Sequence, residues 1–252
     1  MSRRHHSPGP SLLLLLLATI LLPGCAHKKT QVAVPPPPEP APAQPAANQT
    51  ASNQPSTESA GDIRLRAGAK PIFEQTGTAS WYGPPYHNRR GSNGEIYNMN
   101  AMTAAHLTLP LGSIVRVTNL KTGHSALLRI TDRGPFVEGR ILDLSLAAAK
   151  ALDVYLPGTA RVRLEVLEAP AALDVGGRWA IQIGAFADEK SAADLASRLQ
   201  RRYQTAKVQK FPSPTGNWWV RVRVPDDDRQ RAQAVVRETE IAAAPVFLVR
   251  LD

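Results

Sequence analysis

The sequence predicts two small folded domains, the first mainly β and the second α+β, joined to an exported N-terminus by a flexible linker. Three observations support this prediction. From about residue 77 to 168 the chain reads as short strands with few helices, which is typical of a compact barrel. Residues 177–252 read as βαββαβ. Residues 30–61 are rich in Pro, Ala, Gln, Asn, Ser and Thr, a composition that cannot bury a core.

The N-terminus has the features of a bacterial lipoprotein signal. Two arginines precede an apolar run at residues 12–22, which is too short to span a bilayer but has the length of a signal-peptide core. The run ends at Leu22-Pro23-Gly24-Cys25, which resembles a lipobox. We therefore expect lipidation of Cys25, and Ala26 after it favours sorting to the outer membrane. The predicted segments are a signal peptide at 1–24, a Pro/Ala-rich linker at 25–74, a barrel at 75–168 and a second domain at 175–252.

Composition limits the classes of partner. The net charge of +9 favours an anionic partner, and a generic basic surface is the simpler interpretation. Export argues against nucleic acid. Cys25 is the only cysteine and the six histidines are scattered, so we expect no intrachain disulfide, no metal and no cofactor.

The expected elements follow from alternation and capping residues. In the first domain, Ser145 is a candidate N-cap for a helix at 147–152. Strands are expected at 78–82, 113–119, 125–131, 141–144 and 161–167. In the second domain, helices are expected after Asp188 and after Asp227 or Asp228. Strands are expected there at 179–184, 207–211, 218–224 and 245–251.

Candidate catalytic residues lie at strand ends and turns. Asp132 follows an alternating strand that stops at Gly-Pro, Glu95 lies in a Ser-Asn-Gly-Glu turn, and His106 closes Met-Thr-Ala-Ala-His. Trp81 and Tyr82 form an aromatic pair of the kind that stacks on sugar rings. Carboxyls near exposed aromatics favour glycosidic-bond chemistry. Taken singly, each residue also has a structural interpretation: a turn for Asp132 and Glu95, a satisfied buried ring for His106, and core packing for the aromatics.

The first domain closely resembles the rare lipoprotein A (RlpA) family over residues 77–167. The matching motifs are Gly77-Thr78-Ala79-Ser80-Trp81-Tyr82-Gly83, Asn93-Gly94-Glu95, Thr103-Ala104-Ala105-His106, Thr131-Asp132-Arg133-Gly134-Pro135-Phe136 and Gly139-Arg140-Ile141-Leu142-Asp143-Leu144-Ser145. The resemblance implies a double-psi β-barrel and an endolytic transglycosylase of peptidoglycan. It places the family's functional positions on Glu95, His106 and Asp132. We further expect Trp81, Tyr82, Asn93 and Arg133 to bind the substrate.

The implied reaction needs an acid and then a base. The enzyme protonates the oxygen between N-acetylmuramic acid (MurNAc) and N-acetylglucosamine (GlcNAc), and then deprotonates the C6 hydroxyl that attacks C1, which gives a 1,6-anhydro ring. One carboxyl can perform both steps, and we assign them to Asp132. Glu95 is expected to raise the pKa of Asp132 or to stabilise the transition state, and His106 to orient a carboxyl or a substrate hydroxyl. Asp143 is given a structural role at the turn before the helix.

The chain departs from the family pattern at two places. Gly91-Ser92 stands where Thr-Ala is usual, and Tyr97-Asn98-Met99 stands where Phe-Asp-Met is usual. The second change removes a carboxylate near the expected cleft.

The second domain begins with Trp179-Ala180-Ile181-Gln182-Ile183-Gly184-Ala185-Phe186. From this motif to the C-terminus it resembles a SPOR domain, a module that binds peptide-free (denuded) glycan strands at division septa. Gln182 is expected on the sheet face opposite the helices, and Arg221, its counterpart 39 residues later, shares that face with Trp219. Packing is the alternative for the tryptophan. The partners implied for the whole chain are peptidoglycan glycan strands and, through the lipid anchor, a membrane of the cell envelope.

Two other functions remain compatible with the sequence. The chain could be a non-catalytic septal glycan-binding lipoprotein, because a binding cleft uses the same aromatics and carboxyls. It could also be a hydrolase that uses Glu95 and Asp132 as its carboxyl pair.

Overall fold

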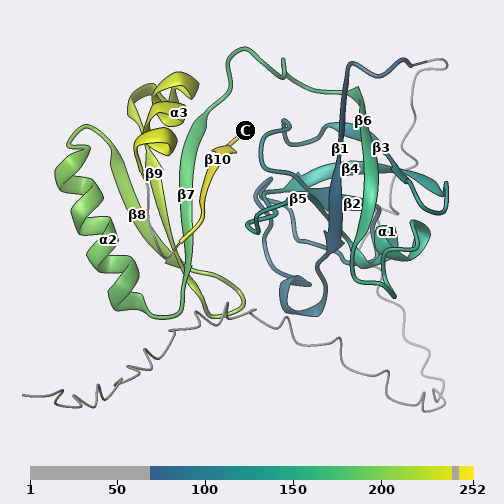
Figure 1. Ribbon diagram of the computed structural model, residues 1–252, viewed down its shortest axis with the longest axis horizontal. Coiled ribbons are helices and arrows are strands. Elements are labelled where there is room, and N and C mark those ends of the chain that lie inside the picture. Colours follow the sequence, from purple (N-terminus) through teal and green to yellow (C-terminus); the bar gives the residue numbers. More distant parts are fainter. Residues whose placement is uncertain (1–68, 240–243) are drawn as a thin grey trace, which may run out of the picture. The chain divides into compact units, whose positions relative to one another are not determined.

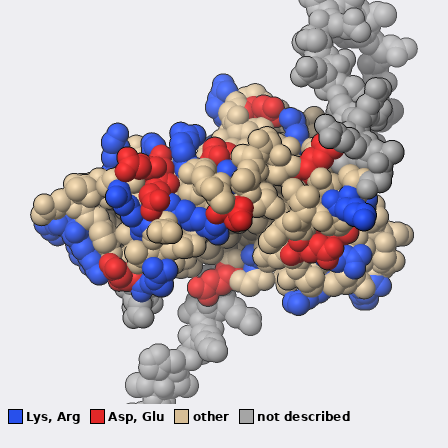
Figure 2. Space-filling model, turned by 90° about the horizontal axis from the view of Figure 1, so that it is seen from above, with Lys and Arg blue, Asp and Glu red and all other residues tan. Residues whose placement is uncertain are grey.

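The computed structural model describes residues 69–239 and 244–252. The predicted signal peptide, Cys25 and nearly all of the linker lie outside these residues. Among the residues that the model describes, no helix is both long and apolar enough to cross a membrane. On the face shown in Figure 2, Lys and Arg side chains are interspersed with Asp and Glu rather than separated from them.

The first domain is a closed six-stranded barrel in the order β1-β5-β2-β4-β3-β6 (Figure 1). Its elements are β1 (Phe73–Trp81), a 3₁₀ turn (Pro84–Tyr86), β2 (Thr103–Ala105), β3 (Ile114–Asn119), β4 (Ser125–Asp132), β5 (Arg140–Leu144), α1 (Leu146–Ala151) and β6 (Ala160–Glu168). The pairing is mixed: β1 with β5 and β2 with β4 are parallel, and the other pairs are antiparallel. Closure leaves the barrel without a free edge.

The barrel is filled by alternating apolar residues, as the sequence predicted. Val115 and Val117 of β3, Leu128 and Ile130 of β4, and Leu142 of β5 are fully buried in one core. Truncating such a side chain to Ala costs about 2–5 kcal/mol in cores of this kind. The alternation of buried and exposed side chains along these strands therefore favours a closed barrel.

The predicted helix cap is confirmed. Ser145 is extended and its Oγ accepts the backbone N–H of Ala148, 3.1 Å away, at the start of α1. The Ser145 Oγ–H donates in turn to the carbonyl of Ala101. A cap of this type is worth about 1 kcal/mol, and here it also ties the end of β5 to the loop before β2.

The strand β2 at residues 103–105 was not predicted from the sequence. Three residues are too few to show alternation, yet β2 lies between the two acid-bearing strands β4 and β5. Ala105 of β2 is paired with Asp132 on one side and with Asp143 on the other. This register places both carboxyl-bearing residues at one level of the barrel.

The second domain has the predicted βαββαβ order. Its elements are β7 (Trp179–Phe186), α2 (Glu189–Arg202), β8 (Lys207–Pro212), β9 (Trp218–Arg223), a 3₁₀ turn (Pro225–Asp227), α3 (Arg229–Glu238) and β10 (Val246–Arg250). The strands form one sheet in the order β10-β7-β9-β8, and α2 and α3 cover one of its faces (Figure 1). Asp188 and Asp228 cap the two helices by accepting backbone N–H groups, which confirms both cap predictions.

Candidate functional site

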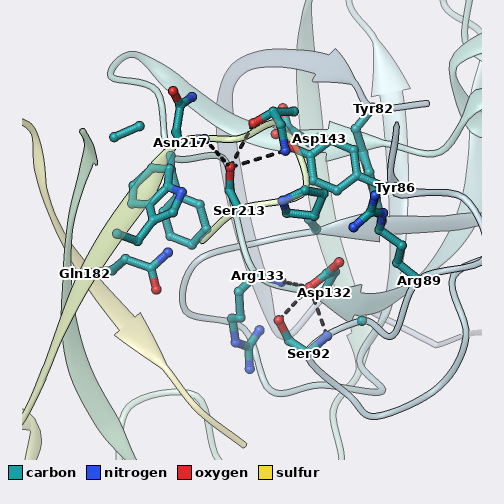
Figure 3. A pocket seen from close by; sticks show the side chains of 18 of the residues that line it. Tyr82, Tyr86, Arg89, Ser92, Asp132, Arg133, Asp143, Gln182, Ser213 and Asn217 are labelled. Carbon is teal, nitrogen blue, oxygen red and sulfur yellow. Dashed lines mark hydrogen bonds between the residues drawn. The ribbon is translucent and has the colours of Figure 1, made fainter. Parts of the chain in front are cut away.

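A pocket opens beside the carboxyl end of β4 (Figure 3). The barrel residues that line this pocket include Tyr82, Tyr86, Ser92, Tyr97, Asp132 and Asp143. It therefore combines two carboxyls with three tyrosine rings, a composition suited to a sugar chain.

Asp132 is held by its Oδ1 atom. This oxygen accepts hydrogen bonds from the Ser92 backbone N–H (3.0 Å), the Ser92 hydroxyl (2.5 Å) and the Arg133 backbone N–H (2.8 Å), as Figure 3 shows in part. Among the described residues no hydrogen bond reaches Oδ2, and a Cβ added at Gly91 would lie 3.6 Å from it. One oxygen is thus anchored and the other remains available.

His106 supports the backbone and does not line the pocket. Its Nδ1 accepts the backbone N–H groups of Thr108 and Leu109 at 3.1 and 3.0 Å, and its Nε2 lies 3.1 Å from Oε1 of Gln75. These partners fix the neutral tautomer with the proton on Nε2. Burial, with a smaller contribution from the charge of Arg133, lowers the pKa of His106 to about 3. The backbone N–H of His106 donates to the carbonyl of Asp132 at 3.1 Å, so the residue helps to place the end of β4.

Glu95 and Asn93 lie in the turn but do not line the pocket. Glu95 makes a two-point ion pair with Arg129, at 3.1 and 3.3 Å, and its side chain is 55% exposed. The side-chain amide oxygen of Asn93 accepts a hydrogen bond from the backbone N–H of Glu95. The backbone N–H of Asn93 donates to the carbonyl of Thr131. The turn therefore docks onto β4 and brings Ser92 to Asp132.

The two predicted aromatics have different surroundings. Trp81 packs against the barrel core with its ring 5.1 Å from Tyr155, and it does not line the pocket. Tyr82 lines the pocket, stacked on Tyr97 at 4.4 Å and edge-on to Tyr86 at 5.6 Å. The sequence had left both outcomes open for this pair.

Arg133 is tied to the barrel backbone. Its Nη1 donates to the carbonyls of His106 and Leu109 at 3.1 and 2.8 Å. The guanidinium thus fixes the loop after β2 against the end of β4, although Arg133 also lines the pocket.

Asp143 and Ser92 are pocket residues whose part the sequence analysis did not foresee. Asp143 alternates with Leu142 and Leu144, which belong to the core, so it projects from the opposite face of β5. Its Oδ1 accepts the Ser80 hydroxyl at 2.5 Å and lies 3.6 Å from Nε of Arg140. Burial raises the pKa of Asp143. An acid between two core leucines in a strand was the available signal, and for Ser92 it was the departure from the usual alanine.

In the second domain the predicted binding residues share one sheet face. Ile181, Ile183, Val220 and Val222 pack with the helices, so by alternation Gln182, Trp219 and Arg221 project from the other face. The Gln182 amide oxygen accepts hydrogen bonds from Arg221 at 2.6 and 3.2 Å, across the β7–β9 pair. The Arg221 guanidinium lies over the Phe211 ring, 5.0 Å from its centre. Trp219 covers Gly184, where a Cβ would be only 2.6 Å from the indole.

No group of three or more His, Cys, Asp or Glu side chains that could hold a metal ion occurs among residues 69–239 and 244–252. In the hydrogen bonds described above, the side chains of the pocket contribute carboxyl, hydroxyl and guanidinium groups.

Comparison with known proteins identifies both domains. Residues 74–164 match the family model described as "Lytic transglycolase", and residues 175–244 match that of the SPOR domain. The predicted fold, a double-psi barrel followed by a SPOR domain, is thereby confirmed.

Curated relatives carry the same domain. The endolytic peptidoglycan transglycosylase RlpA of Campylobacter jejuni is 41% identical over 153 residues, which is 51% of this chain and 55% of the relative. Proteins of the same name from Vibrio cholerae and Neisseria meningitidis are 56% and 57% identical over 95 and 93 residues, covering 38% and 37% of this chain and 36% and 39% of theirs. The chain spans about half the length of the first relatives it matches. Among solved structures, Streptomyces papain inhibitor is 19% identical over 39% of this chain and 97% of its own, with a TM-score of 0.33, which is too low to support an argument.

Proposed function

Because these are the two domains of an RlpA-family protein with a C-terminal SPOR domain, we propose that the chain is an endolytic peptidoglycan transglycosylase. It would cleave the MurNAc–GlcNAc bond and leave a 1,6-anhydro-MurNAc end. The observation that carries the proposal is the anchored carboxyl of Asp132 in a tyrosine-lined pocket. The names of the relatives support the same reaction.

Asp132 is the centre of this chemistry in our proposal. A carboxylate with one oxygen fixed and the other available can take the proton of the C6 hydroxyl as that oxygen attacks C1. Water is not consumed, because the nucleophile belongs to the same sugar. Tyr82 and Tyr86 would stack against the rings on either side of the bond.

We propose that Glu95 and His106 support the site without contacting the reacting atoms. Glu95 steadies the turn that carries Ser92, through its ion pair with Arg129. His106 steadies the end of β4 through its backbone bond to Asp132. We therefore regard both as positioning residues.

The SPOR domain would hold the enzyme on its substrate. The face that carries Gln182, Phe211, Trp219 and Arg221 would supply aromatic rings for sugars and a guanidinium for their hydroxyl and acetamido oxygens. In the structure Gln182 and Trp219 are buried, with 2% and 9% of their surface exposed, so binding would have to uncover them. We propose that this face binds peptide-free glycan strands, which are concentrated at the division septum. Lipidation of Cys25 would anchor the chain in the envelope, at the outer membrane.

The test is mass spectrometry of products from peptide-stripped glycan strands, using the soluble chain from Ala26 onward. Anhydro-MurNAc ends from the unaltered chain and none from Asp132→Ala are expected. Asp153→Asn, an exposed carboxylate of the same barrel, is the matched control and should cleave normally. Reducing ends would show a hydrolase instead. Absence of any cleavage, with binding retained, would show a binding protein.

Binding by the second domain is tested separately by co-sedimentation with the same strands. Arg221→Ala should weaken binding. Arg198→Ala removes an equal charge from the exposed side of α2 and should not. Equal losses from both variants would mean that the attraction is unspecific and arises from net charge.

A further inference from the structure

A second carboxyl belongs to the same pocket as Asp132. Ala105 of β2 is paired with Asp132 on β4 and with Asp143 on β5, so the two acids stand two strands apart at the same level. Two strand spacings separate their Cα atoms by about 10 Å. Both side chains line the same pocket (Figure 3).

Little side-chain volume stands between them. Ala105 contributes a methyl group, and Gly134 contributes none: a Cβ added at Gly134 would lie 3.7 Å from Cβ of Ala105 and 3.7 Å from Oδ2 of Asp143. Neither Ala105 nor Gly134 therefore places a large side chain between the two acids.

The two carboxyls have opposite surroundings. Asp132 accepts three hydrogen bonds on Oδ1, two of them from backbone N–H groups. Asp143 is recessed, with 16% of its side chain exposed, and accepts one hydroxyl, from Ser80. The charged groups that face Asp143 are Arg140 on its own strand, which favours ionisation, and Asp132, which opposes it. Burial is the largest influence and raises the pKa of Asp143.

Tyr82 adds an uncommitted donor. Its hydroxyl is buried and has no hydrogen-bond partner among the described residues. Burial, followed by the charges of Asp132, Tyr97 and Asp143, raises the pKa of Tyr82 well above 10, which keeps the hydroxyl protonated. A buried hydroxyl without a partner costs free energy unless a ligand supplies one. The pocket is therefore built to receive a polar group next to the two acids.

We propose that Asp143 is the proton donor of the reaction, and that Asp132 acts as the base. The inference rests on the proposed transglycosylase function. It divides between two carboxyls the two proton transfers that the sequence had assigned to Asp132 alone.

The proton balance is simple. The carboxylic acid of Asp143 gives its proton to the bridging oxygen as the C1–O bond breaks, and GlcNAc leaves with a neutral hydroxyl. The C6 oxygen bonds to C1, and its proton passes to Oδ2 of Asp132. Each turnover leaves Asp143 ionised and Asp132 protonated, and exchange with solvent resets the pair. Two carboxyls in different surroundings are a common means of running an acid step and a base step in one site.

The test compares two leaving groups. An aryl β-glycoside of the GlcNAc–MurNAc disaccharide, with 4-nitrophenolate as the leaving group, departs without protonation, whereas the sugar hydroxyl of a glycan strand needs it. Asp143→Asn should lower kcat on glycan strands by about 10²–10⁴-fold and on the aryl substrate by less than about tenfold. Asp132→Asn should lower both by about 10²-fold or more. Asn at position 143 can still accept the Ser80 hydroxyl, so the local hydrogen bond is kept.

Three outcomes contradict the proposal. If Asp143→Asn cleaves glycan strands at nearly the normal rate, Asp143 is not the donor. If it loses both substrates equally while its circular dichroism is unchanged, its role is not proton donation. If the unaltered chain makes no anhydro ends, the proposed function fails, and the inference fails with it.

A second variant covers the case in which Asp143→Asn does not fold. Ser80 donates to Asp143 and thereby lowers the pKa of that carboxyl. Ser80→Ala should raise it, so the alkaline limb of the pH–kcat profile, where the donor loses its proton, should move to higher pH. Ser197→Ala, an exposed serine on α2 of the second domain, is the control and should leave the limb in place. An unmoved limb in Ser80→Ala would refute the assignment.

Discussion

Neutral, buried His106 should make the barrel sensitive to acid. A histidine whose pKa is about 3 when folded and 6.5 when unfolded binds its proton only on unfolding within that window. The stability is therefore fully present above pH 6.5 and is lost as the pH falls toward 3. At about 1.4 kcal/mol per pH unit, lowering the pH from 7 to 5 should remove about 2 kcal/mol of the free energy of unfolding.

The perturbation is His106→Asn. The side-chain oxygen of Asn can accept the backbone N–H groups of Thr108 and Leu109, as Nδ1 of His106 does, but it does not titrate. The variant is less stable at pH 7, because it is smaller and loses the bond to Gln75. Its loss of stability between pH 7 and 5 should nevertheless be smaller than that of the unaltered chain by about 2 kcal/mol.

The assay is urea unfolding of the soluble chain at both pH values, followed by far-ultraviolet circular dichroism. His124→Asn, which removes an exposed histidine of the same barrel, should keep most of the pH dependence. Equal pH dependence in His106→Asn and the unaltered chain would refute the reasoning, as would an NMR titration of His106 with a midpoint near 6.5. Either result would mean that burial does not keep this ring neutral.

Three further outcomes are expected. Ser92→Ala introduces the residue usual in the RlpA family and removes one of the three hydrogen-bond donors to Asp132. It should lower kcat on glycan strands by up to about tenfold. A loss as large as that of Asp132→Ala would show that the two backbone donors do not hold the carboxyl. Tyr97→Phe removes a hydrogen bond to the Tyr82 carbonyl and should cost about 1 kcal/mol in urea unfolding, with the rate little changed. Glu95→Gln breaks an exposed ion pair, so unfolding should change by less than about 1 kcal/mol, and a kcat loss beyond tenfold would mean that Glu95 touches substrate.

The fold was predictable because its strands alternate and its helices carry recognisable caps. Ser145 and Asp188 were identified from residue type alone and Asp228 as one of two alternatives with Asp227, and each of the three caps its helix. β2 was not predictable, since three residues carry no period and its place in the barrel depends on pairing with strands far along the chain.

The site was predictable only in part. Asp132 was singled out where a strand ends at Gly-Pro, and the resemblance to the RlpA family favoured a functional role over a turn; the structure places it in the pocket. The surroundings of His106 and Glu95, one buried with backbone partners and one exposed with Arg129, depend on contacts between distant segments, which no local pattern encodes. Asp143 was classed as structural because a single strand does not reveal which residue its neighbours bring opposite it.

The short strand β2 has a consequence for how this site can change. The spacing of the backbone at the two acids is set by strand pairing through Ala105. Substitutions around the pocket can therefore alter its polarity or its rim while the backbone positions of the two acids stay constant. The barrel thus keeps the backbone spacing of the two acids constant while the surrounding residues vary. Libraries aimed at new glycans should therefore vary the loops and leave residues 103–105 unchanged.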